Sequence, residues 1–297
     1  MSRYHFYIAN FFLTVAEIRI EPLSSAELVE TARRELNENP ETRPEAIAQF
    51  KESILNKQGI TGCTDDGFLL RFLRARKFKI EKALELYVSY YATRKYYPDI
   101  FEGLHPTSIK HVLKDGIVAL LPNKDSNGRS IILMRVGLWN PDNFSFTDLF
   151  KTNLIIVEEL LFSDPSVQVN GIVVVIDLTH FSFRQASNLM SAKFARRAAK
   201  FLQETTPIRV RAVHMYNEPS IFTYVFAVLK PFLKAKNQKK VIMHGPSLAC
   251  LHEHVAPEVL PNNCDLAGLA PPIPDLVSDF LSAGLAGFSS CWSLVAA

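Results

Sequence analysis

Gly171-Ile172-Val173-Val174-Val175-Ile176-Asp177-Leu178 is the stretch of sequence that decides the fold. The consecutive β-branched residues from Ile172 to Ile176 favour an extended strand. A strand that is apolar on both faces is typical of a mostly parallel sheet with helices packed on either side. The run therefore predicts a strand that is buried on both faces, inside an α/β domain.

The segments on either side of this run alternate between strand and helix patterns. Residues 116–121 and 131–136 are short apolar runs that flank the turn signal Asn127-Gly128, which predicts a hairpin or an adjacent strand pair. Further strands are predicted at 209–216 and 240–244. Because strands and helices alternate from about residue 100 onward, the predicted class is α/β. The helices are predicted at residues 146–162, 187–204 and 218–236.

The first hundred residues carry helical patterns instead. The pair Ser24-Ser25 is suited to cap a first helix, and Pro44 is suited to the first turn of a second one. A third helix is expected to begin near Asp65, and a fourth is expected over residues 80–97. The pattern predicts a small all-helical module over residues 22–100.

These patterns divide the 297-residue chain into four parts. The predicted α/β domain, with a mostly parallel sheet, follows the all-helical module. The parts are a leader that we expect to be poorly ordered (1–21), the helical module (22–100), the α/β domain (101–262) and an atypical tail rich in Ala, Leu and Ser (263–297).

The overall composition excludes several classes of function. The chain is 48% hydrophobic and 21% charged, which is typical of a globular protein with a sizeable core. Its 21 phenylalanines suit a large apolar interior, because phenylalanine has no polar atom to satisfy. A net charge of +3 is too small to indicate a nucleic-acid partner. No apolar run is long enough to cross a bilayer.

Signatures of common enzymes are missing from the sequence. It has no phosphate-binding Gly-Lys-Ser/Thr loop, no dinucleotide glycine fingerprint and no Gly-x-Ser-x-Gly motif. His252-Glu253-His254 lacks the spacing that places two histidines on one helix face for zinc. Asp177 ends a strand, where α/β enzymes often keep catalytic carboxylates, but no nucleophile pairs with it, so a structural role is favoured. We expect no catalytic residue, no metal and no cofactor.

The predicted helix 218–236 carries the most information about function. It begins at Asn217-Glu218-Pro219 and has a broad apolar stripe, while lysines crowd its C-terminal end. One interpretation is a lid over an apolar pocket, with a basic end that meets anionic lipid head groups. The other is an ordinary core-packed helix with a solvated end. The stripe consists of Ile221, Phe222, Val225, Phe226, Leu229, Phe232 and Leu233, and the lysines are Lys230, Lys234, Lys236, Lys239 and Lys240.

Two other groups of basic residues suit anionic ligands. Arg209 and Arg211 alternate on a strand, so they share one face. A buried sheet face does not accept two unpaired guanidinium groups, so we expect both near the strand end, facing water or a phosphate. The second group either binds phosphate or forms a solvated helix face with salt bridges to neighbouring acids. It consists of Arg71, Arg74, Arg76, Lys77 and Lys79.

Several motifs resemble those of a known family. The segment from Asp66 to Phe78, Asp-Gly-Phe-Leu-Leu-Arg-Phe-Leu-Arg-Ala-Arg-Lys-Phe, is similar to the N-terminal domains of the CRAL-TRIO (Sec14-like) lipid-binding family. The resemblance covers about residues 25–262. It implies a helical N-terminal module, an α/β lipid-binding domain and a lid helix at about 218–236 that opens at membranes. Segments that resemble its α-tocopherol transfer protein-like branch are residues 35–43, Asn217-Glu218-Pro219, Lys230-Pro231-Phe232-Leu233 and Met243-His244-Gly245.

The resemblance also implies which residues bind ligands. In that branch four basic positions hold a phosphoinositide head group, and by position they correspond to Arg76, Arg209, Lys236 and Lys240. Small hydroxyl residues near the pocket in that branch correspond here to Asn153 and Val157, a departure from a tocopherol pocket. Position in the predicted elements, together with the resemblance, suggests a pocket lined by Phe150, Leu154, Val157, Ile172, Val174, Phe201, Leu202, Ile208, Val210, Ile221, Val225 and Leu229.

Together these observations predict a carrier without enzymatic activity. It encloses one hydrophobic lipid, tocopherol-like or retinoid-like, and transfers it at phosphoinositide-containing membranes. The expected location is the cytoplasm, with peripheral association with endosomal or other internal membranes, and no protein partner is indicated. The alternatives are a carrier of retinaldehyde or phosphatidylinositol, a membrane scaffold that senses phosphoinositides without transfer, and a hydrolase that uses Asp177.

Overall fold

A computed structural model describes residues 23–260, so the predicted leader and tail lie outside the described residues. Its sheet has five strands in the order β1-β2-β3-β4-β5. The first two pair antiparallel and the other neighbours pair parallel, which confirms the predicted strand pair and the mostly parallel α/β sheet. The strands are β1 (Val118–Leu120), β2 (Ser130–Met134), β3 (Ile172–Asp177), β4 (Val210–Tyr216) and β5 (Val241–Met243).

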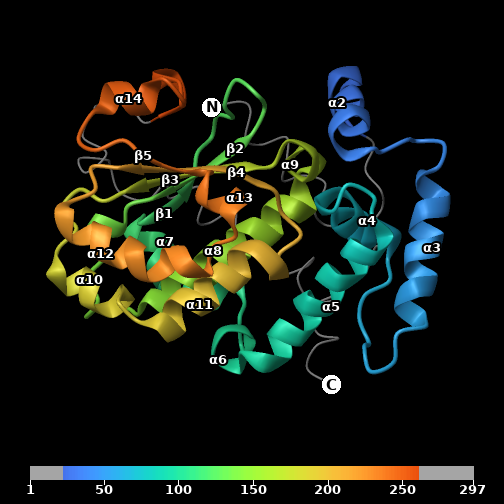
Figure 1. Ribbon diagram of the computed structural model, residues 1–297, viewed down its shortest axis with the longest axis horizontal. Helices are drawn as coiled ribbons and strands as arrows, with labels where there is room; N and C mark the ends of the chain where they lie inside the picture. The colour runs from blue at the N-terminus through green and yellow to red at the C-terminus, as the bar shows by residue number, and fades with distance from the viewer. Residues whose placement is uncertain (1–22, 261–297) are drawn as a thin grey trace.

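The run that decided the fold forms the middle strand, β3. Val173 and Val175 lie on one face and pack with Leu251 of α14 (Leu248–His252). Ile172 belongs to the larger core on the other face, where helices of the α/β domain cover the sheet (Figure 1). Helices cover both faces of the sheet, which is the reason that β3 is apolar from Ile172 to Ile176.

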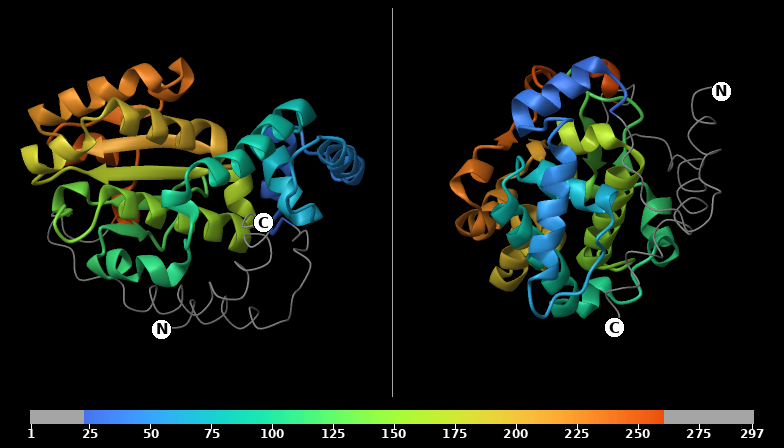
Figure 2. Two further views of the ribbon diagram at one scale, coloured as in Figure 1. Left: turned by 90° about the horizontal axis from the view of Figure 1, so that it is seen from below. Right: turned by 90° about the vertical axis from the view of Figure 1, so that its right-hand side faces the viewer.

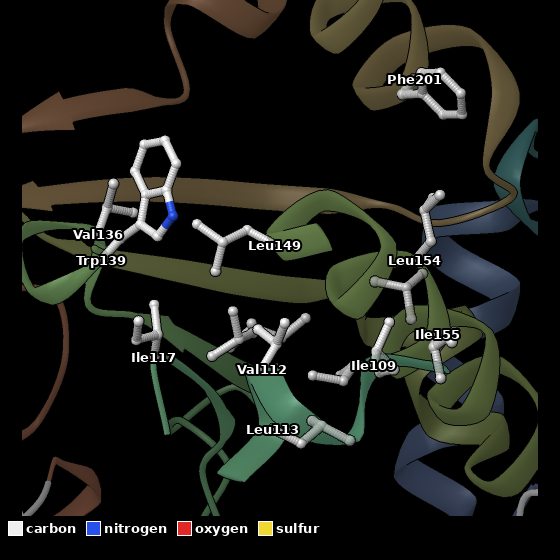
Figure 3. Close-up of a cluster of buried hydrophobic side chains, with 14 of the residues drawn as sticks. Ile109, Val112, Leu113, Ile117, Val136, Trp139, Leu149, Leu154, Ile155 and Phe201 are labelled. Atoms are coloured by element: carbon white, nitrogen blue, oxygen red, sulfur yellow. The ribbon is translucent and has the colours of Figure 1, made fainter. Parts of the chain in front are cut away.

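The helix α8 (Phe146–Ser163) is the centre of that larger core. A capping box starts it, because the Ser145 hydroxyl accepts from the Asp148 amide and the Asp148 carboxylate accepts from Ser145. Figure 3 shows side chains of α8, including Leu149 and Leu154, close to those of η1 (Pro106–Ile109) and α7 (Lys110–Asp115). The helices α6 (Pro98–Phe101) and α9 (Pro165–Asn170) lie against α8, and η2 (Val136–Leu138) adds to the same core. The turn η5 (Pro257–Val259) packs on the other face of the sheet.

Two helices expected to be continuous are broken. The segment 187–204 belongs to three elements: α10 (Phe183–Leu189), α11 (Ala192–Lys200) and a π-helical turn, η3 (Phe201–Thr205). The break at Met190 comes where Ser191 caps a new helix by accepting from the Phe194 amide. A new cap makes a second helix start where the periodicity alone predicted continuity.

The predicted lid helix 218–236 is also divided. It consists of α12 (Ser220–Leu229), the short 3₁₀ turn η4 (Lys230–Phe232) and α13 (Ala235–Gln238). Pro231 explains the break, because proline has no amide hydrogen and its ring clashes with the carbonyl one turn earlier. The apolar lid segment α12 and the lysine-rich segment after it are therefore separate elements.

The N-terminal module is all-helical, as predicted, and lies at one end of the molecule (Figures 1 and 2). Ser25 and Asp65 cap its first and third helices with their side-chain oxygens. Its core is aromatic, with Phe68, Phe72 and Tyr87 in mutual edge-on or tilted contact. The helices are α2 (Ala26–Leu36), α3 (Arg43–Leu55), α4 (Asp66–Ala75) and α5 (Ile80–Tyr96).

Buried ion pairs join this module to the α/β domain. Glu158 of α8 accepts from Arg71 of α4 at 3.3 Å and from Arg94 of α5 at 2.8 Å. Arg74 donates to Glu38 at 2.8 Å and to the Gln168 side chain of α9 at 2.9 Å. Neither alternative, phosphate binding or a solvated helix face, is correct for Arg71 and Arg74, because both are buried against carboxylates that lie 36 or more residues away in the chain.

Candidate functional site

Some side chains at the middle of the sheet are only partly buried on the face that α8 covers. Val174 and Ile176 lie on β3, the third of five strands, and both are half-buried. Val213 of β4 pairs with Val174 and is half-buried as well. Side chains at the centre of a close-packed, helix-covered sheet are normally buried completely. Their partial exposure therefore indicates a hollow between the sheet and its helices.

The predicted pocket residues fall mostly within one apolar cluster on this face. Leu202 does not join them, because it is 51% exposed although its neighbour Phe201 is buried. Leu229 is half-buried near the end of α12. The buried members are Leu154, Val157, Ile172, Phe201 and Val225, and half-buried residues that pack against them are Phe150, Val174, Ile208, Val210 and Ile221.

The segment between α5 and η1 contributes aromatic side chains to this cluster that sequence reasoning missed. The ring of Phe201 lies 4.8 Å from that of Phe150, 5.7 Å from that of Phe101 and 5.6 Å from that of Tyr97, centroid to centroid. Tyr97 follows directly after α5, and Phe101 ends α6. No local signal distinguishes them from ordinary core aromatics, so only the packing of the module against the domain reveals them.

A small pocket opens beside Phe150. Its lining is mainly apolar, but Arg197 and Thr147 bring polar atoms to it. Arg197 donates to Asp99 at 2.6 Å and lies over the ring of Tyr97. Other lining residues are Ile100, Phe194 and Ala198. This pocket is thus mainly apolar, with one guanidinium in its lining.

The contacts of Asp177 stabilise the turn that follows β3. It is 1% exposed, and its Oδ1 atom accepts from the backbone amide and the hydroxyl of Thr179. These bonds hold the turn that follows β3. Among residues 23–260, no group of His, Cys, Asp and Glu side chains is arranged to hold a metal ion.

Basic side chains converge where β4 begins. Arg209 donates to the Val169 carbonyl at 2.6 Å, Arg211 to the Asn170 carbonyl at 2.7 Å, and Lys240 to the Val210 carbonyl at 2.7 Å. Burial and the positive charges of Lys236, Arg211 and Arg209 lower the pKa of Lys240. We call Arg209, Arg211, Lys236 and Lys240 the basic cluster. It contains three of the four predicted head-group residues.

Glu35 of α2 pairs with this cluster, which sequence reasoning missed. Its Oε2 atom accepts from Arg209 at 2.9 Å and also from Arg211. Burial acts to raise the pKa of this carboxyl, but the hydrogen bonds and charges of Arg211 and Arg209 outweigh it and lower the pKa to about 2. The two guanidinium groups do lie together at the strand end, but they face a carboxylate of the helical module.

The fourth predicted residue, Arg76, reaches the same region by another route. Its guanidinium donates to the Gln203 carbonyl at 3.4 Å. The Gln203 side chain accepts from the Lys234 amide and from the Asn237 side chain, at 2.7 and 2.8 Å. Arg76 is therefore linked to the lysine-rich segment through Gln203. Burial lowers the pKa of Arg76, and the negative charges of Glu85 and Glu204 act in the opposite direction.

Among residues 23–260, no helix combines the length and the hydrophobicity that a membrane span requires.

The CRAL/TRIO domain family matches residues 114–265, and its N-terminal domain family matches residues 43–89. Clavesin-2 of Homo sapiens is 37% identical over 251 residues, 84% of this chain and 76% of that protein. The alpha-tocopherol transfer protein-like protein of Homo sapiens is 37% identical over 236 residues, 79% of this chain and 68% of that protein.

The crystal structure of Sfh5 aligns at 14% identity and a TM-score of 0.42, over 79% of this chain and 85% of that chain, a likeness too small to support an inference. The family matches cover both the helical module and the α/β domain. The two relatives extend across most of the same region. This chain therefore belongs to the CRAL-TRIO family of lipid-binding proteins.

Proposed function

We propose that this protein carries one hydrophobic, tocopherol-like lipid and transfers it at phosphoinositide-containing membranes. The observation that carries the proposal is the partial exposure of Val174, Ile176 and Val213 at the centre of a covered sheet. An apolar hollow in that place is suited to an apolar ligand. Each Å² of apolar ligand surface removed from water contributes about 25 cal/mol, so enclosure is favourable.

The segment α12 is the proposed lid. Phe222 and Val225 are buried against the core, whereas Tyr224 is 66% exposed. A helix that is apolar on both its inner and outer faces suits two environments, a closed pocket in water and an open one against lipid. The break at Pro231 lets α12 change its position without carrying the lysine-rich segment with it.

The basic cluster is the proposed contact with the membrane, together with Arg76. Each basic residue near an anionic membrane surface contributes about 1 kcal/mol. A head group that binds more tightly when the lid is open shifts the population toward the open state, and the ligand leaves. The proposed location follows: cytoplasmic, with peripheral attachment to endosomal or other internal membranes.

The polarity of the side chains that line the proposed pocket favours one class of ligand. The predicted lining residues that join the core cluster are all apolar, which favours a tocopherol or a retinoid such as retinaldehyde. A phosphatidylinositol ligand needs hydrogen-bonding side chains around its head group inside the pocket. Arg197 and Thr147 are polar groups beside Phe150, so they suit a single oxygen function at one end of the ligand.

Native mass spectrometry of the purified protein, followed by organic extraction, tests the carrier function. One apolar lipid bound at one-to-one stoichiometry supports it. A protein that stays empty after addition of tocopherol, retinaldehyde and phosphatidylinositol, yet binds phosphoinositide vesicles, is instead a membrane scaffold.

The lid mechanism has its own test. The double variant Lys236→Ala, Lys240→Ala should slow ligand transfer to phosphoinositide vesicles and leave ligand binding nearly intact. Lys57→Ala with Lys95→Ala serves as the matched control for charge, since both lysines lie in the helical module. Equal loss of binding and transfer in the test variant contradicts the mechanism.

A further inference from the structure

Arg197 of α11 brings an unused hydrogen-bond donor to the pocket beside Phe150. Its side chain lines this pocket, and its Nε atom is buried. No group among residues 23–260 accepts a hydrogen bond from that atom. Buried donors in folded proteins are almost always paired, because an unpaired donor loses its water without gaining a partner. The unpaired Nε–H group therefore indicates an acceptor that a bound molecule supplies.

The rest of this guanidinium group is held in place by its neighbours. Its Nη2 atom donates to Asp99 of α6 at 2.6 Å, and its Cζ atom lies 4.7 Å from the centre of the Tyr97 ring. The Arg197 side chain is 19% exposed. A donor that is fixed before binding loses little conformational entropy when its acceptor arrives. Because Asp99 already balances the positive charge, the remaining donor does not need an anionic acceptor, and a neutral oxygen suits it.

The surface next to this donor is suited to the hydrocarbon part of a lipid. Phe150 and Phe194 line the same pocket as Arg197. The ring of Phe150 also lies 4.8 Å from that of Phe201, centroid to centroid, and both residues belong to the apolar cluster beside the sheet. A lipid that packs against this cluster can therefore place one oxygen beside Arg197.

We infer that the Nε–H group of Arg197 donates to a neutral oxygen of the bound lipid, and that this bond makes the carrier prefer lipids with such an oxygen over hydrocarbons. This inference rests on the proposed function, because it concerns the same ligand. A guanidinium group donates and never accepts, so a carbonyl oxygen serves as well as a hydroxyl. A hydrocarbon in the same position leaves the donor buried and unpaired, which is how a site built to hydrogen-bond an oxygen rejects the analogue that lacks it.

Two pairs of lipids test this preference. The first is retinaldehyde and its hydrocarbon analogue, in which a methyl group replaces the aldehyde, and the second is phytol and the hydrocarbon phytene. Equilibrium dialysis of the radiolabelled lipids against the full chain gives the ratio of the hydrocarbon Kd to the oxygen-bearing Kd for each pair. Arg197→Met keeps an unbranched side chain but has no donor. It should lower both ratios by roughly ten- to hundredfold, the factor that a hydrogen bond to a charged group supplies.

Arg196→Met is the matched control. Arg196 is the neighbouring residue on α11, is exposed, and lies over the ring of Phe232 rather than in the pocket lining. Its substitution removes the same charge from the same helix and should leave both ratios unchanged. Arg197→Lys keeps a positive charge to pair with Asp99 but has no Nε–H group, so its ratios should fall as well, even if Arg197→Met does not fold. Ratios that stay high in Arg197→Lys assign the preference to the charge and overturn the inference.

The carbonyl stretching frequency of bound retinaldehyde, measured by Raman spectroscopy, reports the contact directly. A hydrogen bond weakens the C=O bond, so the frequency should rise in Arg197→Met and Arg197→Lys and stay constant in Arg196→Met. An unchanged frequency in both Arg197 variants contradicts the contact. If no lipid of either pair binds to the wild type, the proposed carrier function fails and this inference fails with it. If the lipids bind and all variants keep the wild-type ratios, only the inference fails.

Discussion

Removing the charge of Glu158 is the sharpest test of how the two parts of the molecule are held together. Its side chain is 5% exposed and accepts hydrogen bonds from Arg71 and Arg94, each of which is 4% exposed in its side chain. Removing one partner of a buried ion pair typically costs about 3–5 kcal/mol, because the remaining charge stays buried. Glu158→Gln keeps the volume but removes the carboxylate that two buried guanidinium groups share, so we expect a loss of about 3–5 kcal/mol.

Urea unfolding, extrapolated linearly to water, measures this loss. Glu159→Gln is the control on the next position of α8. Burial raises the pKa of Glu159 to about 7, so near neutral pH this carboxyl is already partly protonated. Its replacement should change the free energy of unfolding by less than about 1 kcal/mol. Similar effects of the two substitutions, or a loss below about 1 kcal/mol for Glu158→Gln, would refute the argument from buried charge.

Three further predictions concern the core, the pH dependence and the lid. Phe201→Ala should cost about 3–5 kcal/mol in urea unfolding, because Phe201 is 3% exposed, whereas Leu202→Ala should cost less than about 1 kcal/mol, because Leu202 is 51% exposed. Burial, with the nearby imidazoles, lowers the pKa of His214 to about 4 from an ordinary value of 6.5, so the folded state keeps it neutral while the unfolded state binds a proton. The contribution of neutral His214 to the free energy of unfolding is therefore complete above pH 6.5 and is lost as the pH falls toward 4. When the free energy of unfolding is measured against pH, His214→Gln should flatten the curve in this range, and His252→Gln should not. Pro231→Ala restores an amide donor, so hydrogen exchange near residue 231 should slow if the proline causes the break after α12, and unchanged exchange would contradict that cause.

The sequence predicted the structure correctly where the deciding residues are neighbours in the chain. The apolar run of β3 predicted a strand buried on both faces, and the strand lies in the middle of the sheet. Asp65 predicted the start of α4, and its side chain caps that helix. The break at Pro231 also had a local signal, but the broad apolar stripe on both sides of the proline favoured one long helix. The spacing of apolar residues indicates which face of a helix is apolar, but it does not detect the missing amide hydrogen of a proline.

Partners that lie far apart in the chain could not be predicted. Arg71 lies 87 residues before Glu158, and in the sequence it resembles any arginine on a solvated helix. Glu35 likewise gives no sign of the two arginines that it meets near residue 210. Most predicted pocket residues do gather in one apolar cluster, because strand and helix positions determine which face they occupy. The half-burial of Val174 and Ile176 depends on three-dimensional packing, which a pattern along the chain does not contain.

The ion pairs of Glu158 have a consequence for the order of folding during synthesis. Arg71 and Arg94 leave the ribosome 87 and 64 residues before the carboxylate that neutralises them. At roughly 5–20 residues per second, Arg71 waits about 4–17 s for its partner. The helical module has its own aromatic core, yet during that interval its two arginines have no α8 against which to be buried. The nascent module therefore lacks its cover on that side until α8 emerges and docks.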